Sequence, residues 1–184
     1  MRGTCSPGFT ITAEFAPEQI LPEPFVRISS QSMVPLSHIL WAYVWLGIAT
    51  DAFDRAHAFV RGAARKSPGT VTPGAAKLAS LMSTLALLRA DVRQGLTDYL
   101  AASEEELETV QWALRINTLK ISASEQAPQI CQGALAICGI VGYLNTTPFS
   151  VGRHLRDAMS GCLMIANERI LGTNAALLAV AKET

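Results

Sequence analysis

The sequence predicts an all-α fold, an antiparallel four-helix bundle preceded by a short extended segment. Two observations predict it. Beyond about residue 36, apolar side chains recur every three or four residues through four long segments. Short connections with proline, glycine or capping residues separate these segments, which makes neighbouring helices antiparallel. With 184 residues, of which 49% are hydrophobic, the chain is long enough to bury a core between four helices.

The first 32 residues differ from the rest of the chain. GFTITAEF (8–15) alternates apolar and polar residues, a pattern typical of a strand. PEQILPEPFV follows, and its three prolines suit neither a helix nor a central strand. Because a lone strand is unstable, we expect its partner strands to be missing or to lie on another chain. We therefore expect an extended β remnant over 1–32 and a helical bundle domain over 33–184.

The first two predicted helices have clear ends. We expect the first from about residue 36 to 65, since Ser-Pro-Gly at 67–69 ends it. Pro73 fits the first turn of the second helix. The stripe predicted for the first helix is Leu40, Tyr43 or Val44, Gly47, Thr50 or Asp51, Asp54 and Ala58. The stripe predicted for the second is Leu78, Leu81, Leu85, Leu88, Val92, Leu96 and Tyr99.

Capping residues and glycines delimit the remaining helices. Ser103 and Glu106 have the spacing of a capping box, which predicts a third helix from about residue 104. Pro128 lies inside that helix and should kink it or divide it near Glu125. Gly139 and the glycine three residues later end it, and a fourth helix should run from about 150 to 181.

Composition narrows the classes of partner. Fifteen basic and fifteen acidic side chains cancel, so we expect neither nucleic acid nor an anionic membrane as a partner. The longest apolar stretch, LWAYVWLGIA, falls short of the roughly 20 residues of a membrane span. Only 16% of residues are charged, which favours a surface partly covered by another subunit or a large ligand. We expect a cytoplasmic protein.

Cysteines and histidines provide no metal site. Cys5, Cys131, Cys138 and Cys162 have no CxxC spacing, and we interpret them as reduced core thiols. The three histidines are far apart in the sequence and lack metal-ligand spacing. His154 lies among arginines, where it either contacts an anion or is a solvated or capping residue.

The stretch CGIVGYLNTTPFSVGRHLRD (138–157) carries the strongest functional signal. Glycine after a helix C-terminus is either a cap or a place where a ligand approaches the backbone. Arg153 and Arg156 lie one turn apart and share a helix face. They could clamp a phosphate or carboxylate, or Arg156 could pair with Asp157.

These residues resemble a signature of the acyl-CoA dehydrogenase family, a Gly-Gly-x-Gly-Tyr loop, a proline and an Arg-x-x-Arg-Asp helix start. The matching residues are Gly139, Gly142, Tyr143, Pro148, Arg153, Arg156 and Asp157. The resemblance covers nearly the whole chain but only about the latter half of a family member. Residues 1–32 resemble the end of the middle β domain, and 33–184 resemble the C-terminal four-helix bundle.

The resemblance implies binding of flavin adenine dinucleotide (FAD), an acyl thioester substrate, and a homodimer or homotetramer assembled through the bundle. In the family, this corner lies against the FAD of a neighbouring subunit. The FAD-binding residues implied are Arg61, Gly139, Gly142, Tyr143, Arg153 and Arg156. Two departures are notable, since Ile140 replaces the second glycine of the pair and Ala136 replaces the glutamine that usually precedes the loop.

The resemblance also locates the general base of α,β-dehydrogenation. The glutamate of most members falls on Ile165, and the site used by others falls near Ser37, so neither position holds a carboxylate. Glu168, almost one turn beyond Ile165, is the candidate base. Alternatively, Glu168 pairs with Arg169 or Arg153 at the surface.

Two functions remain open. The chain is the C-terminal part of a flavin-dependent acyl-CoA dehydrogenase-like oxidoreductase, inactive without the remaining domains, or it is a catalytically silent helical assembly module that binds no flavin.

Overall fold

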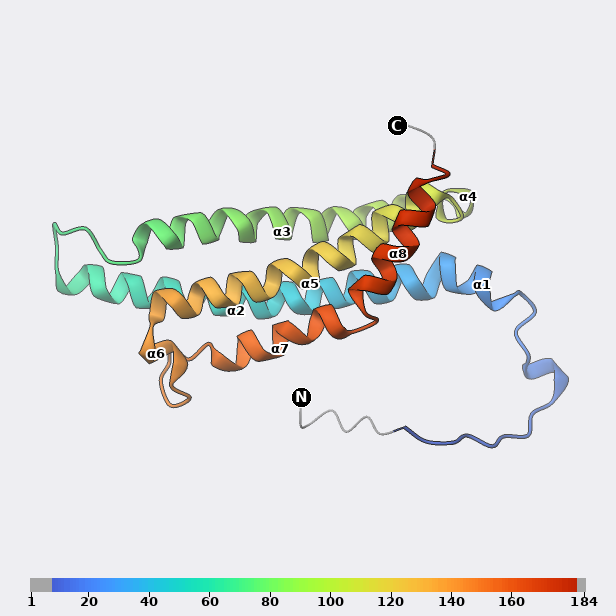
Figure 1. The fold of residues 1–184 in the computed structure, drawn as a ribbon, viewed down its shortest axis with the longest axis horizontal. Helices are drawn as coiled ribbons and strands as arrows, with labels where there is room; N and C mark the ends of the chain where they lie inside the picture. Colours follow the sequence, from blue (N-terminus) through green and yellow to red (C-terminus); the bar gives the residue numbers. More distant parts are fainter. Residues whose placement is uncertain (1–7, 182–184) are drawn as a thin grey trace.

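Figure 1 shows the computed structural model, which describes residues 8–181. These residues form helices and no strand, which confirms the predicted all-α class. In chain order the elements are η1 (Pro17–Gln19), α1 (Phe25–Ile28), η2 (Ser29–Met33), α2 (Val34–Lys66), α3 (Ala75–Ala101), α4 (Glu104–Leu107), α5 (Val110–Cys138), α6 (Ile140–Tyr143), α7 (Gly152–Leu163) and α8 (Asn167–Leu178).

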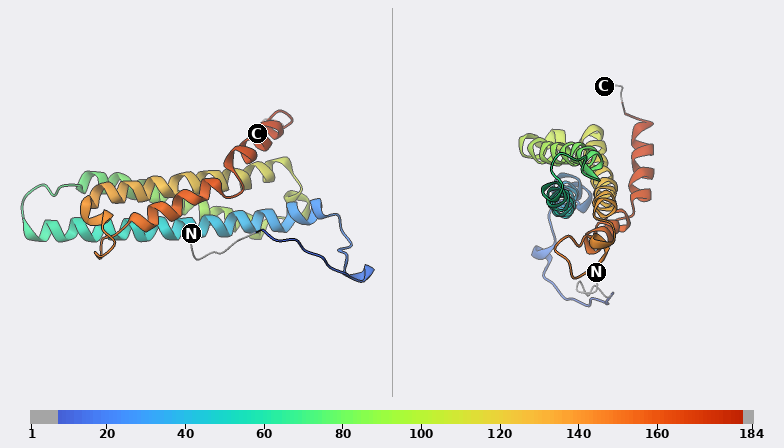
Figure 2. Two further views of the ribbon diagram at one scale, coloured as in Figure 1. Left: turned by 60° about the horizontal axis from the view of Figure 1, so that its bottom comes forward. Right: turned by 90° about the vertical axis from the view of Figure 1, so that its left-hand side faces the viewer.

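The bundle consists of α2, α3, α5 and α7. The long helices α2 and α5 run parallel and form the most extensive contact, whereas α3 and α7 run in the opposite direction (Figure 1). Both α3 and α7 pack against this central pair. The last helix, α8, packs on α5 and crosses the bundle obliquely (Figures 1 and 2).

Alanines form much of the contact between α2 and α5. On α2, Ala42, Ala49, Ala52 and Ala56 are fully buried, and α5 contributes further alanines of the same kind. Small side chains let two helices approach closely over a long distance. The apolar stripe of α3 is confirmed, with Leu85, Leu88 and Val92 in the core and the rest packed around it.

The stripe predicted for the first helix was wrong. Leu40 and Val44 are each 59% exposed, and Asp51 and Asp54 of that stripe are exposed as well. The core face of α2 lies on the other side, at Ile39, Ala42 and Trp45. The large apolar residues of this helix lie on both faces, and the alanines that mark the core face were overlooked.

The helix containing α2 begins earlier than predicted, because α1, η2 and α2 are continuous from Phe25 to Lys66. The π-type turn η2 precedes Pro35, which cannot donate a hydrogen bond to the carbonyl four residues earlier. The proposed division between 1–32 and 33–184 falls inside this continuous helix and remains a prediction. By length and composition the helix could cross a membrane, but it also provides a wall of the bundle core.

The predicted strand is absent from the described part of the N-terminal segment. Residues 8–16 have no regular structure, and Phe9, Ile11 and Phe15 are 79%, 76% and 63% exposed. A strand needs a neighbour to satisfy its backbone hydrogen bonds, and residues 8–181 supply none. Residues 1–7, including Cys5, lie outside the described residues.

The capping box is confirmed, but the helix that it starts is short. Ser103 Oγ accepts from Glu106 N at 3.3 Å, and Glu106 Oε2 accepts from Ser103 N at 2.7 Å. This box caps only α4, and Thr109 then caps α5 by accepting from Trp112 N at 3.1 Å. Similarly, α3 begins at Ala75 after Gly74, just beyond Pro73.

Pro128 does not divide α5, which is continuous from Val110 to Cys138. Proline deprives the carbonyl of Ser124, four residues earlier, of its helical donor. The thiol of Cys162 on α7 donates to that oxygen at 3.2 Å. A partner from another helix thus satisfies the group that proline leaves free.

The fourth predicted helix is two helices, so a single helix over 150–181 was wrong. The chain turns between α7 and α8 at Ile165 and Ala166, whose φ angles are 55° and 35°. Because a left-handed backbone interrupts α-helical hydrogen bonding, α8 leaves the axis of α7 (Figure 1).

Candidate functional site

The glycine corner, residues 139–143, follows the C-terminus of α5. Gly139 has φ 59° and ψ −142°, a conformation that essentially only glycine adopts. Gly142 is buried, and a Cβ atom there would lie 2.6 Å from Cys138 Cβ. Gly139 therefore ends α5, and Gly142 lets α6 fold back onto it. Local structure explains both glycines, and at Gly139 no atom would approach an added Cβ within 4 Å.

A compact loop, residues 144–151, connects the glycine corner to α7. Val151 N donates to Gly142 O at 2.8 Å, and Thr147 Oγ1 donates to Val141 O at 2.7 Å. Val151 is fully buried. The loop is therefore fixed in its middle and at its C-terminal end to the corner that precedes it, which places the first turn of α7 beside α6.

A pocket of about 440 Å³ lies beside the glycine corner, between the end of α2, the start of α3 and the end of α5. Its walls include Phe59, Ile137 and Ala136, and Lys77 lies at its edge. Ala136, where the resemblance predicts a glutamine, is one of the residues that line this space. We call this space the corner pocket.

The predicted FAD-binding residues gather at one end of the bundle. Arg61 lies near the end of α2, and this end reaches the same side of the molecule as α6 (Figure 1). Gly139 and Tyr143 are exposed there, with Tyr143 at 67%. Arg153 and Arg156 lie in the first turns of α7, and both are exposed.

The arginines differ in their partners. Arg156 Nε lies 3.5 Å from Asp157 Oδ1, so Arg156 pairs with Asp157, the alternative to a role in anion binding. The Arg156 side chain is nevertheless 68% exposed. Among the described residues, neither Arg61 nor Arg153 forms an ion pair. These two guanidinium groups are therefore free to meet an anion.

The position at which the resemblance predicts the general base, Ile165, lies in the α7–α8 link, residues 164–166. Ile165 is 39% exposed there, and Ser37, at the other family position, donates its hydroxyl to Met33 O at 2.6 Å. Glu168 is exposed in the first turn of α8 and forms no ion pair with a described residue. Its assignment as the base remains a prediction.

Lys120, a residue of α5, fixes this link through hydrogen bonds. Its side chain is fully buried, and Nζ donates to Met164 O at 2.6 Å, Asn167 Oδ1 at 2.6 Å and Gly161 O at 3.2 Å. The ammonium also lies 5.7 Å from the centre of the Trp45 ring. A positive charge at the C-terminus of α7 meets the carbonyls that the helix leaves free.

Burial lowers the pKa of Lys120 because it disfavours the charged form, while Cys162 and Glu125 act in the opposite direction. Asn167 extends the network, donating through Nδ2 to Ser124 Oγ at 3.0 Å and to Glu125 Oε1 at 3.3 Å. Sequence reasoning missed Lys120. The available signal was its position on the buried face of α5, beside Ile116 and Ala123.

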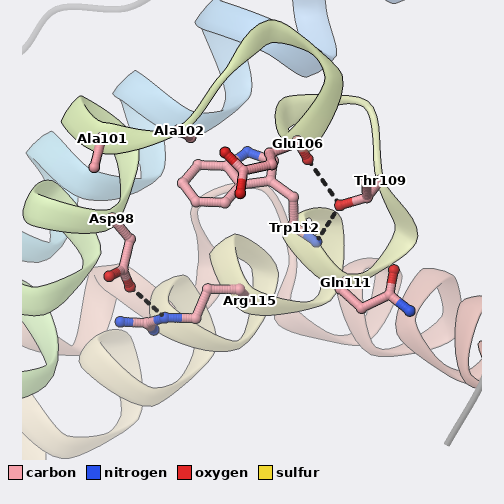
Figure 3. Close-up of a pocket in the computed structure, with 8 residues that line it drawn as sticks. All are labelled: Asp98, Ala101, Ala102, Glu106, Thr109, Gln111, Trp112 and Arg115. Carbon is pink, nitrogen blue, oxygen red and sulfur yellow. Dashed lines mark hydrogen bonds and ion pairs between the residues drawn. The ribbon is translucent and has the colours of Figure 1, made fainter. Parts of the chain in front are cut away.

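A second pocket, of about 430 Å³, lies between α3, α4 and α5 (Figure 3). Trp112 forms part of its wall, and Arg115 bonds to Asp98 at 3.3 Å and to Asp91 at 2.9 Å. Two carboxylates already neutralise this guanidinium, so the pocket offers an anion little attraction.

Residues 8–181 contain no cluster of three or more His, Cys, Asp or Glu side chains that could hold a metal ion. Cys131 and Cys138 are buried free thiols, and burial raises the pKa of Cys131 to about 12. These thiols are therefore protonated and inert at neutral pH.

The family described as acyl-CoA dehydrogenase, C-terminal domain, matches residues 30–165. No curated protein and no solved structure matches the chain significantly. The match covers α2 to α7 and ends within the α7–α8 link, so it includes the bundle and the glycine corner. The chain therefore belongs to the acyl-CoA dehydrogenase family, whose C-terminal domain it contains.

Proposed function

We propose that this chain is the C-terminal part of a cytoplasmic, flavin-dependent oxidoreductase that acts on the CH–CH bond of an acyl thioester. The observation that carries the proposal is the placement of Arg61, Gly139 and Tyr143 at the end of the bundle where the corner pocket also lies. An exposed glycine backbone and unpaired guanidinium groups suit the diphosphate of a dinucleotide.

The residues present fit FAD in two respects. The space at Gly139 is open, so a ligand can approach the main chain, and Arg61 and Arg153 are charged and unpaired among the described residues. One feature opposes close contact, since Ile140 is 70% exposed where the family has glycine. Arg61 and the glycine corner would hold the cofactor, and bound FAD would supply the hydride acceptor.

Proton abstraction requires a carboxylate, and Glu168 is the candidate within this chain. Its position in the first turn of α8 stabilises the negative charge through the helix dipole. Deprotonating an acyl thioester also requires walls that exclude water, and the described residues of the α7–α8 link are partly exposed. We therefore infer that the chain is inactive without the domains that complete the site.

The same chain is proposed to form a homodimer or a dimer of dimers through its helices. Leu36, Leu40 and Val44 form an exposed apolar row on the outer face of α2, beginning near Met33. A row of this kind is typical of a surface that another protein surface covers. Burying it against a second copy would account for the low proportion of charged residues.

Titration with FAD tests whether the chain binds this cofactor and whether Arg61 contributes to the site. We expect weak, saturable quenching of flavin fluorescence by the wild-type chain. Arg61→Gln should weaken it, whereas Arg65→Gln, four residues further along and also exposed, serves as the matched control. Equal affinity of both variants and the wild type would remove Arg61 from the site. Absence of quenching in all three, both alone and with the remaining domains supplied, would refute the FAD assignment.

The alternative is a catalytically silent assembly module, favoured by Ile165 at the base position and Ile140 in the glycine corner. Activity with an acyl-CoA and an artificial electron acceptor separates the two functions once a companion polypeptide with the remaining domains is supplied. Turnover that Glu168→Gln abolishes supports the oxidoreductase. No turnover and no flavin uptake in that complex support the silent module.

A further inference from the structure

Three polar side chains, Asp51 and Arg55 on α2 and His154 on α7, attach the loop 144–151 and the start of α7 to α2. Asp51 Oδ2 accepts from Arg55 Nε at 2.8 Å and lies 2.6 Å from His154 Nε2. Because a carboxylate only accepts, the histidine carries its hydrogen on this nitrogen. Asp51 thus connects one turn of α2 with the first turn of α7.

Arg55 extends the connection into the loop. Its Nη1 donates to Ser150 O at 3.1 Å and to Pro148 O at 3.3 Å, the carbonyls on either side of Phe149. The Phe149 ring meets Phe59 edge to face, with centroids 5.5 Å apart. Phe59 is itself a wall of the corner pocket. A continuous series of contacts therefore runs from Asp51 to the pocket.

The histidine of this arrangement is buried, although the Asp51 side chain is 54% exposed. The side chain of His154 is only 10% exposed, and its Nδ1 has no partner among the described residues, so Asp51 supplies its hydrogen bond. The solvated or capping role considered for His154 is therefore wrong. Partial burial raises the pKa of Asp51, but the hydrogen bonds from Arg55 and His154 outweigh it, and the pKa lies below its ordinary value.

We propose that Asp51, Arg55 and His154 are positioning residues for the glycine corner and its pocket. Asp51 orients the guanidinium and the imidazole, Arg55 holds the main chain around Phe149, and Phe149 holds Phe59 at the pocket. Arg153, adjacent to His154, is placed by the same contacts. This inference rests on the proposed flavin site for its function, but the loop attachment itself can be measured without flavin.

The test compares Asp51→Asn with Asp54→Asn. Asp54 lies on the same helix, is exposed and forms no ion pair with a described residue, so its variant is the matched control. We expect amide hydrogen exchange in residues 144–155 to accelerate about tenfold or more in Asp51→Asn, since hydrogen bonds to a charged acceptor are lost. Exchange in α3 should not change, which shows that the bundle remains folded.

Conservative replacement and FAD affinity complete the test. Arg55→Lys keeps the charge, but a lysine cannot reach the carboxylate and the two carbonyls together. Amide hydrogens of residues 144–155 should therefore exchange as fast in Arg55→Lys as in Arg55→Gln. The dissociation constant for FAD should rise in Asp51→Asn and remain unchanged in Asp54→Asn. Unchanged loop exchange in Asp51→Asn would overturn the proposal. If the loop loosens but the wild type binds no FAD, the attachment holds and the proposed cofactor is wrong.

Discussion

The Nζ atom of Lys120 lies 2.6 Å from the main-chain oxygen of Met164, and this bond connects the centre of α5 to the end of α7. Asn167 Oδ1, on the first residue of α8, accepts from the same ammonium at 2.6 Å. One buried charge therefore determines where α7 stops and where α8 starts. This position matters because Ile165, between them, is the residue at which the resemblance predicts the family's catalytic glutamate.

Replacement of this lysine should release α8. Lys120→Met retains the side-chain volume but removes the donor of buried acceptors, and each acceptor left without a donor costs about 1–3 kcal/mol of stability. The methionine also removes the cost of burying a charge, which offsets part of this loss. We expect the free energy of unfolding to fall by about 2 kcal/mol and amide exchange in residues 164–178 to accelerate. Urea unfolding and hydrogen exchange measure the two effects. Lys66→Met, at an exposed site, is the control, and unchanged exchange in α8 would contradict the prediction.

Gly161 should not tolerate alanine. An added Cβ would lie 3.0 Å from Trp45 Cε2 and 3.2 Å from Ser124 Cβ, so α7 would have to move away from α2 and α5. We expect Gly161→Ala to lose about 1–3 kcal/mol of stability. Gly172→Ala, in α8 with open space around it, should gain up to about 1 kcal/mol through higher helix propensity. Thermal unfolding of both variants checks that their stabilities change in opposite directions. A loss of stability in both would exclude packing around Gly161 as the cause.

His38 should make the fold sensitive to acid. Burial lowers its pKa to about 4, with a further contribution from Lys120, whereas a hydrogen bond with the Ile116 backbone raises it. The unfolded chain takes up a proton below about pH 6.5 and the folded chain does not, so stability falls as pH drops from 6.5 and levels off below about 4. The loss is of the order of 3 kcal/mol.

The variant His38→Leu isolates this effect. It removes the titrating group at a site that is only 3% exposed, so the difference between wild type and variant should narrow or reverse as pH falls. Urea unfolding at several values between pH 7.5 and 4 measures that difference. A difference independent of pH would show that His38 takes up its proton equally in both states.

Gly139 should be required for its backbone conformation. Alanine at φ 59° and ψ −142° is strained, and we expect Gly139→Ala to lose about 1–3 kcal/mol although its Cβ meets no neighbour. Gly62→Ala, a helical site with equally open space, is the control and should be neutral or slightly stabilising. Circular dichroism during heating reports both, and equal melting temperatures of the two variants would show that the corner relaxes without cost.

Much of the fold could be predicted because its signals are local. The Ser103–Glu106 box, the end of α2 before Ser67 and the glycine that ends α5 depend on residues a few positions apart. The motif that indicates the family also lies in one short stretch, 138–157, whose glycines have local structural causes. Errors arose where a contact came from elsewhere in the chain. Pro128 was expected to kink α5 or divide it, but it does not divide it, and a thiol from α7 satisfies the carbonyl that it frees.

The sequence by itself determined that the chain is helical, where most helices end, and that it resembles the C-terminal domain of an acyl-CoA dehydrogenase. Only the tertiary structure decided which face of α2 is buried, where α7 gives way to α8, and how Asp51 reaches His154. The physical reason is the range of each interaction. Capping, glycine conformation and helical periodicity act within a few residues. Burial of a charge such as Lys120 depends on acceptors more than forty residues away, which only the folded chain brings together.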